Sequence, residues 1–424
     1  MITSLTEKNI LTQFSLSEED EIKLIIEHWI RILNIKLGWI HDFDKLVFNY
    51  VIIFIFLFIA TTVFMLDTFR SSYKLLKTFD GHTKGVNSID YLEFAGGQIF
   101  CSGSNDKKVR IWNVDTTKQI QLFNKHSSYV YCVKYSPYHY YNHLRNVVCS
   151  SSEDRTIRIW DIKDNQQLQV FNEHLSSVYS IEVSSFNGGR YLCSGSWDNT
   201  VRLWDVEISK SLHVFDKHEN HVYCVDFSPL QSNYNKNDKK SNGIGIVGGN
   251  GYTICSGSHD KTIRIWDIET AKQLLVFHGH RHAAVSVKYG SNKLGIGGGA
   301  NTILSGSKDY SIRLWDIRSG QQIQVFNGHT FFVNAVEYSP FVVNNTKIGG
   351  SSNVICSGSE DSTIRFWDIR SNKKELFMIK GYHKDSLKVL CLKFLQLKKD
   401  CKSNYGRYIN LCCGTKDGSI RIWG

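Results

Sequence analysis

Residues 251–279 read GYTICSGSHDKTIRIWDIETAKQLLVFHG, and the alternation within this stretch decides the fold. Apolar and polar side chains alternate over 252–256 and again over 262–266, a pattern typical of β-strands. A third β-prone run covers 273–277, and 284–289 begins a fourth. Short polar stretches typical of turns separate these runs. The sequence therefore predicts a unit of four antiparallel strands.

This unit recurs seven times, and each copy places an aspartate six residues before a tryptophan. The local spacing is constant although the distance between copies varies, which indicates one duplicated unit with divergent loops. We therefore predict an all-β fold, a seven-bladed β-propeller of four-stranded antiparallel blades over residues 72–424. The seven pairs are Asp106 and Trp112, Asp154 and Trp160, Asp198 and Trp204, Asp260 and Trp266, Asp309 and Trp315, Asp361 and Trp367, and Asp417 and Trp423.

The segments SGSHDKTIRIWDI (256–268) and SGSWDNTVRLWDV (194–206) resemble the WD-repeat family. The resemblance covers residues 72–424 and includes a histidine at the head of most units. It implies a buried hydrogen-bond chain of histidine, aspartate, hydroxyl and tryptophan in each blade, which holds the strands in register. The head histidines are His82, His126, His174, His218, His280 and His329.

Two hydroxyl positions are candidates for this chain, at two and at four residues before each aspartate. In the seventh unit the second of these positions is Cys413, and the head position falls at Asp385. We therefore expect the seventh blade to lack the complete network.

A histidine, an aspartate and a serine together also suggest a catalytic triad, but the presence of seven copies favours a structural role. We expect no enzyme activity, no cofactor and no metal.

The chain ends after the third strand of the seventh unit. Residues 72–79 resemble an outer strand but have no blade of their own upstream. The family resemblance implies that such a strand completes the last blade, which closes the ring and protects its edges.

The net charge of +10 raises the possibility of a nucleic-acid partner. Seven of the cations are arginines inside the repeated motif, on the third strand of each blade, so they form no single basic patch. We therefore consider nucleic acid an improbable partner.

Of the eleven cysteines, six occupy equivalent positions in different blades, too far apart for disulfides. We expect buried, reduced thiols.

Residues 1–46 contain apolar residues at helical spacing, which predicts an amphipathic helix. The run VFNYVIIFIFLFIATTVFML (47–66) has no charged residue, and its length suits a transmembrane helix. Residues 67–71 then form a linker to the propeller. We expect a single-pass membrane protein with a cytoplasmic propeller. A segment packed as buried strands, or a soluble cytoplasmic protein, is the alternative.

The resemblance implies that peptides bind on the face bearing the aspartate turns. The resemblance also implies that three positions per unit point outward there: the residue before the aspartate, and those three and five after the histidine. Aromatic residues gather at these positions in units two to four.

The leading hypothesis is a non-catalytic, membrane-tethered scaffold that binds proteins or peptides. A soluble adaptor or substrate receptor of a ubiquitin-ligase or signalling complex, or a basic RNA-associated assembly factor, are the alternatives. The candidate binding residues are Tyr129, Tyr131, Tyr179, Trp197, His221, Tyr223, His259 and Phe332.

Overall fold

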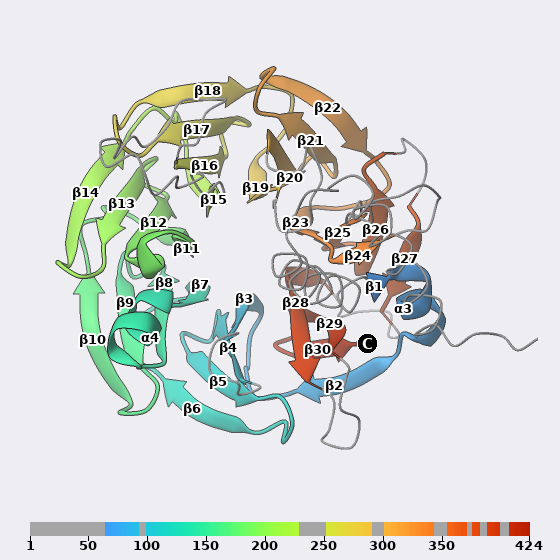
Figure 1. Ribbon diagram of the computed structural model, residues 1–424, viewed down its shortest axis with the longest axis horizontal. Helices are drawn as coiled ribbons and strands as arrows, with labels where there is room; N and C mark the ends of the chain where they lie inside the picture. The colour runs from blue at the N-terminus through green and yellow to red at the C-terminus, as the bar shows by residue number, and fades with distance from the viewer. Residues whose placement is uncertain are drawn as a thin grey trace, which may run out of the picture. The chain divides into compact units, whose positions relative to one another are not determined.

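Seven four-stranded antiparallel sheets follow one another around a ring, as the computed structural model in Figure 1 shows. The prediction of a seven-bladed propeller is therefore confirmed. The chain divides into two units, residues 1–63 and 64–424. The structure describes residues 64–92, 99–228, 252–290, 301–342, 354–370, 375–381, 388–398 and 407–424.

The strands of each blade run from the centre of the ring outward. The innermost strands are β3 (Val86–Tyr91), β7 (Val130–Tyr135), β11 (Val178–Val183), β15 (Val222–Phe227), β19 (Ala284–Tyr289), β23 (Val333–Tyr338) and β28 (Val389–Lys398). The second strands are β4 (Ile99–Ser104), β8 (Val147–Ser152), β12 (Tyr191–Ser196), β16 (Thr253–Ser258), β20 (Thr302–Ser307), β25 (Val354–Ser359) and β29 (Arg407–Thr415).

The third strands carry the motif tryptophans. They are β5 (Val109–Asn113), β9 (Ile157–Asp161), β13 (Val201–Asp205), β17 (Ile263–Asp267), β21 (Ile312–Asp316), β26 (Thr363–Asp368) and β30 (Ile420–Trp423). The outer strands are β6 (Gln119–Phe123), β10 (Gln166–Phe171), β14 (Lys210–Phe215), β18 (Gln273–Phe277), β22 (Gln321–Phe326), β27 (Phe377–Lys380) and β2 (Leu75–Phe79).

The second strand of each blade is buried on both faces, because neighbouring blades pack against it. The small residues of the Ser-Gly-Ser motif make this close packing possible. A Cβ on Gly195 of β12 would lie 2.7 Å from Cγ1 of Val222 in the next blade. The motif glycine is therefore required by the approach of the adjacent inner strand.

The last blade is closed by the N-terminal strand β2. This strand pairs antiparallel with β30, with Leu75 opposite Trp423 and Phe79 opposite Ile420. Phe79 is 1% exposed and packs against Phe100 of blade one, with ring centroids 4.9 Å apart. β2 therefore completes the seventh sheet and also joins it to the first.

The residues before β2 differ from the expected linker at 67–71. They lie in helix α3 (Leu66–Ser72), which follows the two-residue strand β1 (Phe64–Met65). Leu66 and Phe69 are three residues apart on one face of this helix and are buried with core residues of blades six and seven. Burial of this apolar pair explains why the segment is ordered as a helix.

Several other predictions fall on residues that the structure does not describe. The amphipathic helix of residues 1–46 lies outside the described residues, and so do residues 47–63 of the apolar run 47–66. The last three residues of that run belong to β1 and to the start of α3. None of the helices within the described ranges has the length and apolar character needed to cross a membrane.

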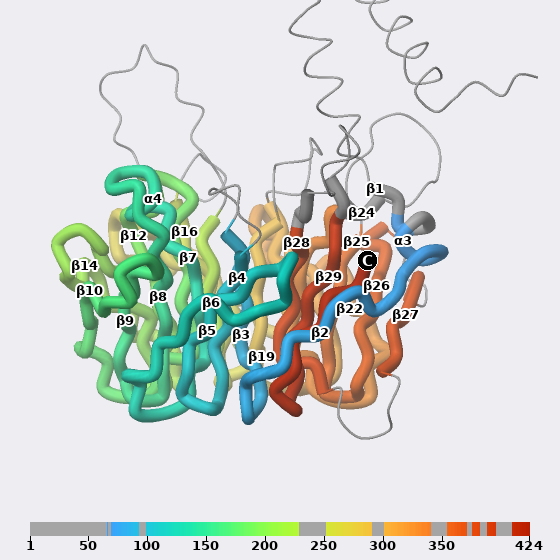
Figure 2. Tube along the Cα trace, turned by 90° about the horizontal axis from the view of Figure 1, so that it is seen from below, coloured from blue at the N-terminus to red at the C-terminus, as the bar shows by residue number. Residues whose placement is uncertain are grey.

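The connections between strands leave the blades at two opposite faces, which Figure 2 shows in side view. We call the face with the seven aspartate turns, between second and third strands, the turn face. Connections from inner to second strands lie at the opposite face. They include α4 (Pro137–His143), the 3-10 helix η1 (Asn187–Gly189) and strand β24 (Phe341–Val342). The longest predicted loop, 230–251, is outside the described residues.

All ten cysteines in the described part of the chain are buried, and none of them forms a disulfide. Their burial agrees with the prediction of packed thiols at equivalent positions. Burial also raises the pKa of thiols such as Cys101 and Cys193 well above the ordinary value, which makes them unreactive.

Candidate functional site

A chain of hydrogen bonds links the head histidine, the turn aspartate and the tryptophan of a blade through one serine. In blade three, His174 Nδ1 lies 2.7 Å from Asp198 Oδ2, and His174 Nε2 lies 2.7 Å from Ser194 Oγ. The Trp204 indole N–H donates to the same Ser194 Oγ at 2.8 Å. The serine hydroxyl therefore serves two buried rings at once.

The same three contacts, each between 2.7 and 2.9 Å, occur in five further blades. The histidine, aspartate and central serine of these blades are His82, Asp106 and Ser102; His126, Asp154 and Ser150; His218, Asp260 and Ser256; His280, Asp309 and Ser305; and His329, Asp361 and Ser357.

The motif tryptophans of these five blades lie where the sequence analysis placed them, in the buried network. Each is at most 2% exposed, and each indole N–H donates to the central serine of its own blade. They are therefore held inside the blades and present no ring to a ligand at the surface. These tryptophans are Trp112, Trp160, Trp266, Trp315 and Trp367.

The structure distinguishes the two hydroxyl positions that the sequence leaves open. The serine four residues before the aspartate, such as Ser194, is the centre of the network. The serine two residues before, such as Ser196, accepts a hydrogen bond from the Asp198 backbone N–H at 3.1 Å and donates to the Ser176 carbonyl at 3.3 Å. The second serine therefore stabilises the turn.

The electrostatics of the network suit a structural role. Burial lowers the pKa of His174 and outweighs the opposing effect of Asp198. Burial alone raises the pKa of Asp198, but hydrogen bonds from His174 and Thr200 outweigh it and hold that pKa below its ordinary range. The result is a neutral histidine beside an ionised carboxylate. Ser194 is 0% exposed, so this hydroxyl cannot reach a substrate in solution.

Blade seven departs from this arrangement. Cys413 replaces the central serine, and no described residue accepts a normal hydrogen bond from the buried Trp423 indole N–H. The weak acceptor Cys413 Sγ lies beside it. Burial raises the pKa of this thiol to about 11, and its contact with Trp423 opposes part of the rise. The turn aspartate Asp417 still accepts hydrogen bonds from Ser419, whereas the expected head position, Asp385, is outside the described residues.

The turn face carries a continuous stack of aromatic rings across blades two to four. Tyr131 stacks on Tyr179 with centroids 4.0 Å apart, and Tyr179 stacks on Trp197 at 5.0 Å. Trp197 in turn stacks on His221 at 4.7 Å. The Trp197 indole nitrogen is buried and has no hydrogen-bond partner among the described residues. The stack joins side chains from three blades into one preorganised surface.

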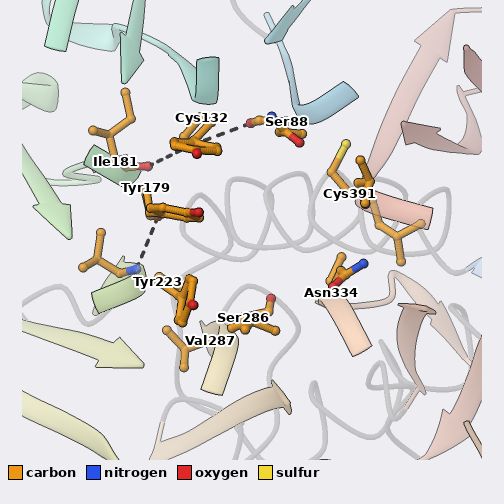
Figure 3. Close-up of a pocket in the computed structure, with 18 of the residues that line it drawn as sticks. Ser88, Cys132, Tyr179, Ile181, Tyr223, Ser286, Val287, Asn334 and Cys391 are labelled. Atoms are coloured by element: carbon orange, nitrogen blue, oxygen red, sulfur yellow. Dashed lines mark hydrogen bonds between the residues drawn. The ribbon is translucent and has the colours of Figure 1, made fainter. Parts of the chain in front are cut away.

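Two more tyrosines extend this surface at its ends. Tyr129 meets Tyr131 edge-on at 6.5 Å, and Tyr223 meets Tyr179 edge-on at 5.1 Å. We call these two residues together with Tyr131, Tyr179 and Trp197 the aromatic rim. All five line a cavity of about 660 Å³ in the centre of the ring. Figure 3 shows Tyr179 and Tyr223 pointing into this cavity.

The remaining three candidate residues lie beside the rim and do not line the cavity. His221 completes the ring stack. The ring centroid of His259 lies 6.1 Å from the ring centroids of both His221 and Tyr223. Phe332 belongs to a second cluster in blades five and six, where its ring centroid is 4.5 Å from Phe331. The structure therefore divides the predicted set into three groups. Five residues form the aromatic rim, His221 and His259 lie beside it, and Phe332 belongs to the second cluster.

Two members of the second cluster were missed by the sequence reasoning. Tyr310 and Phe331 stack with centroids 5.8 Å apart and are 40% and 38% exposed. Tyr310 follows the turn aspartate Asp309, and Phe331 lies two residues after His329. Neither position belongs to the three outward positions that guided the prediction. A search for aromatic side chains next to those positions would have found both.

A ring of charges on the innermost strands was also missed, and five of its seven members line the cavity. It comprises one charged residue on each innermost strand, eight residues after the head position, within an otherwise apolar pattern. Lys134 pairs with Glu182 at 2.6 Å, Lys288 with Glu182 at 3.4 Å and Lys393 with Asp90 at 2.9 Å. The recurrence of a charge at this position was the available signal. The seven residues are Asp90, Lys134, Glu182, Asp226, Lys288, Glu337 and Lys393.

The repeated blade and its buried network define a propeller built from copies of one unit. This chain belongs to the WD-repeat family, because the WD domain, G-beta repeat, matches most of it. The matched segments are 73–113, 117–161, 165–205, 209–267, 271–316 and 320–368. They end before the seventh blade, in which Cys413 replaces the central serine.

Among curated proteins, the chain is similar to the peroxisomal targeting signal 2 receptors of Mus musculus (33% identity over 63 residues) and Homo sapiens (34% over 63 residues). Each match covers 15% of this chain and 20% of the receptor. The chain is also 34% identical over 68 residues to one of the subunits of chromatin assembly factor 1 of Mus musculus, covering 16% and 12% of the two proteins. The matches thus span at most a fifth of these relatives.

Proposed function

We propose that this chain is a non-catalytic scaffold that binds a peptide, or an exposed segment of a partner protein, at the aromatic rim. The observation that carries this proposal is the position of the rim at the mouth of the central cavity. Tyrosine and tryptophan dominate protein-binding hot spots, because they supply a large apolar area at a small cost in conformational entropy. The mutual stacking of the rim fixes its geometry before a partner arrives.

The relatives support a binding role. Two of them are named as receptors for a targeting signal, and the third as part of an assembly factor. Propellers of the WD-repeat family are generally interaction platforms without catalytic activity. Here the histidine, aspartate and serine groups that resemble a catalytic triad are hydrogen-bonded to one another inside the blades. This burial supports a scaffold over an enzyme.

The test compares partner binding by the full chain with that of two variants. Trp197→Ala combined with Tyr223→Ala removes the centre of the rim, whereas Leu144→Ala alters a residue that is 86% exposed beyond α4, at the opposite face. A partner is first identified by crosslinking and mass spectrometry, and its affinity is then measured with purified proteins. We expect the double variant to bind at least roughly tenfold more weakly and Leu144→Ala to bind normally. Equal affinities for all three proteins would refute the proposal.

We also propose that the scaffold is tethered to a membrane with its propeller in the cytoplasm. The support is the uncharged run 47–66, long enough for one crossing. Carbonate extraction of membranes from cells expressing the full chain tests it. We expect the protein to stay in the membrane pellet and a chain lacking 47–63 to be released. Release of the full chain would instead favour a soluble adaptor.

A further inference from the structure

One lysine at the mouth of the cavity has its ammonium group among aromatic rings. Lys308 precedes the turn aspartate of blade five and lines the cavity. Its Nζ donates to the Tyr223 hydroxyl at 3.3 Å and lies 4.6 Å from the centroid of that ring. It also lies 5.8 Å from the ring centroid of Phe332. Lys308 thus bridges the aromatic rim and the second aromatic cluster.

Lys308 differs from the other lysines of the cavity in its partners. Lys134, Lys288 and Lys393 each pair with at least one carboxylate of the charged ring. Lys308 forms no ion pair with any carboxylate in the described ranges. An ammonium that contacts only π-faces and a phenol oxygen keeps hydrogen-bond donors available, and it has no counter-ion of its own.

The surrounding rings also favour negative charge. The faces of Tyr179 are occupied by Tyr131 and Trp197 in the stack, so this ring is left with its edge to offer a ligand. The edge of an aromatic ring carries the positive part of its quadrupole. The pKa of nearby His259 is lowered, first by burial and then by the charge of Lys308.

We infer that the scaffold recognises an acidic peptide segment, in which a carboxylate or a phosphate group pairs with Lys308. This inference rests on the proposed function and adds the chemistry of the partner. An apolar side chain next to the anionic group packs against the exposed parts of Tyr310 and Phe331. The anion is thereby held between the two aromatic clusters, in the gap that Lys308 bridges.

The experiment uses beads carrying blocked nine-residue peptides whose central residue is Glu, phosphoserine, Gln or Lys in equal amounts. All other positions are randomised. The labelled full chain is added, and the bound beads are sequenced. We expect beads with Glu or phosphoserine to exceed those with Gln roughly tenfold, the effect of one charge-assisted hydrogen bond. Preference for phosphoserine over Glu identifies a phosphate ligand, and equal capture identifies a general anion site.

Matched variants assign the preference to the lysine. Lys308→Met keeps the apolar stem and should abolish the acidic preference, whereas Lys308→Arg should retain it. Lys416→Met is the control, because Lys416 holds the equivalent position before the aspartate of blade seven but is exposed and does not line the cavity. Thermal unfolding of each variant checks that the propeller is intact.

The possible failures are distinguishable. If beads bind through the rim with no difference between Glu and Gln, or with a preference for Lys, the acidic-peptide inference is overturned while the scaffold proposal stands. The same holds if Lys308→Met keeps the acidic preference. If no bead class binds the full chain, both the inference and the peptide-binding proposal are overturned.

Discussion

At the scale of single residues, one serine hydroxyl per blade determines whether two buried rings are satisfied. In blade three, Ser194 pairs in register with Arg202, and Trp204 lies two residues further along the same face of the strand. This geometry brings the indole to Ser194 and leaves Ser196 at the turn. The family resemblance predicted the participating residue types. It did not distinguish the two serines, because both are present in almost every repeat and only the strand register separates them.

A pair of opposite substitutions tests the importance of this hydroxyl. Ser194→Ala leaves the buried His174 Nε2 and Trp204 N–H without their partner and should lower the free energy of unfolding by about 3 kcal/mol. Cys413→Ser supplies the missing acceptor to Trp423 in blade seven and should raise it by about 1 kcal/mol. Chemical denaturation of the full chain measures both changes. A destabilised Cys413→Ser protein would show that blade seven has adapted to its thiol.

At the scale of the element, the aspartate turns impose a left-handed backbone on the residue that follows each aspartate. In blades one to six these residues are not glycine, and their φ angles lie between 66° and 71°. Only blade seven uses a glycine, Gly418, with φ of 94°. The sequence predicted a turn at each site but not its conformation. Five of these six residues are lysine, arginine, tyrosine or serine, which carry no signal for positive φ, and only Asn199 is of a type that favours it.

The exposed residue Arg155 allows this strain to be measured. Its φ is 69°, a region that disfavours side chains with a Cβ. Arg155→Gly should therefore raise the free energy of unfolding by about 0.5 kcal/mol, after the greater chain entropy of glycine is subtracted. Arg155→Ala serves as the control, because it removes the same side chain but keeps the Cβ. If the two variants have equal thermal midpoints, backbone strain at this turn is negligible.

Helix α3 shows a different limit of sequence reasoning at this scale. Its seven residues, LDTFRSS, are too few to display a helical period, so a linker was predicted. The helix is ordered by burial of Leu66 and Phe69 against blades six and seven. That contact depends on ring closure, which brings the start of the propeller beside its end. Local pattern alone did not contain this information.

At the scale of the whole propeller, the number of blades and the closure of the ring followed from counting repeats. The detailed geometry of the partner-binding surface did not. Seven copies and one unpaired outer strand were sufficient to predict a closed ring. The aromatic rim was located by the outward positions of each repeat, but its stacking and its relation to Lys308 were not predicted. Those features depend on distances between blades, and the repeat spacing says nothing about them.

Closure of the ring by β2 and β30 predicts a difference between two outer strands. Phe79 and Phe277 occupy the last position of the outer strands β2 and β18, and each is 1% exposed. Replacing either by alanine should cost about 3–5 kcal/mol through the cavity that is left. Their kinetic effects should differ, because β18 continues directly from its neighbour β17 through a short turn, whereas β2 and β30 lie at opposite ends of the propeller sequence. Phe79→Ala should therefore accelerate hydrogen exchange of the β2 and β30 amides selectively, and Phe277→Ala should not affect them. Equal exchange at β2 in the two variants would mean that the ring opens elsewhere.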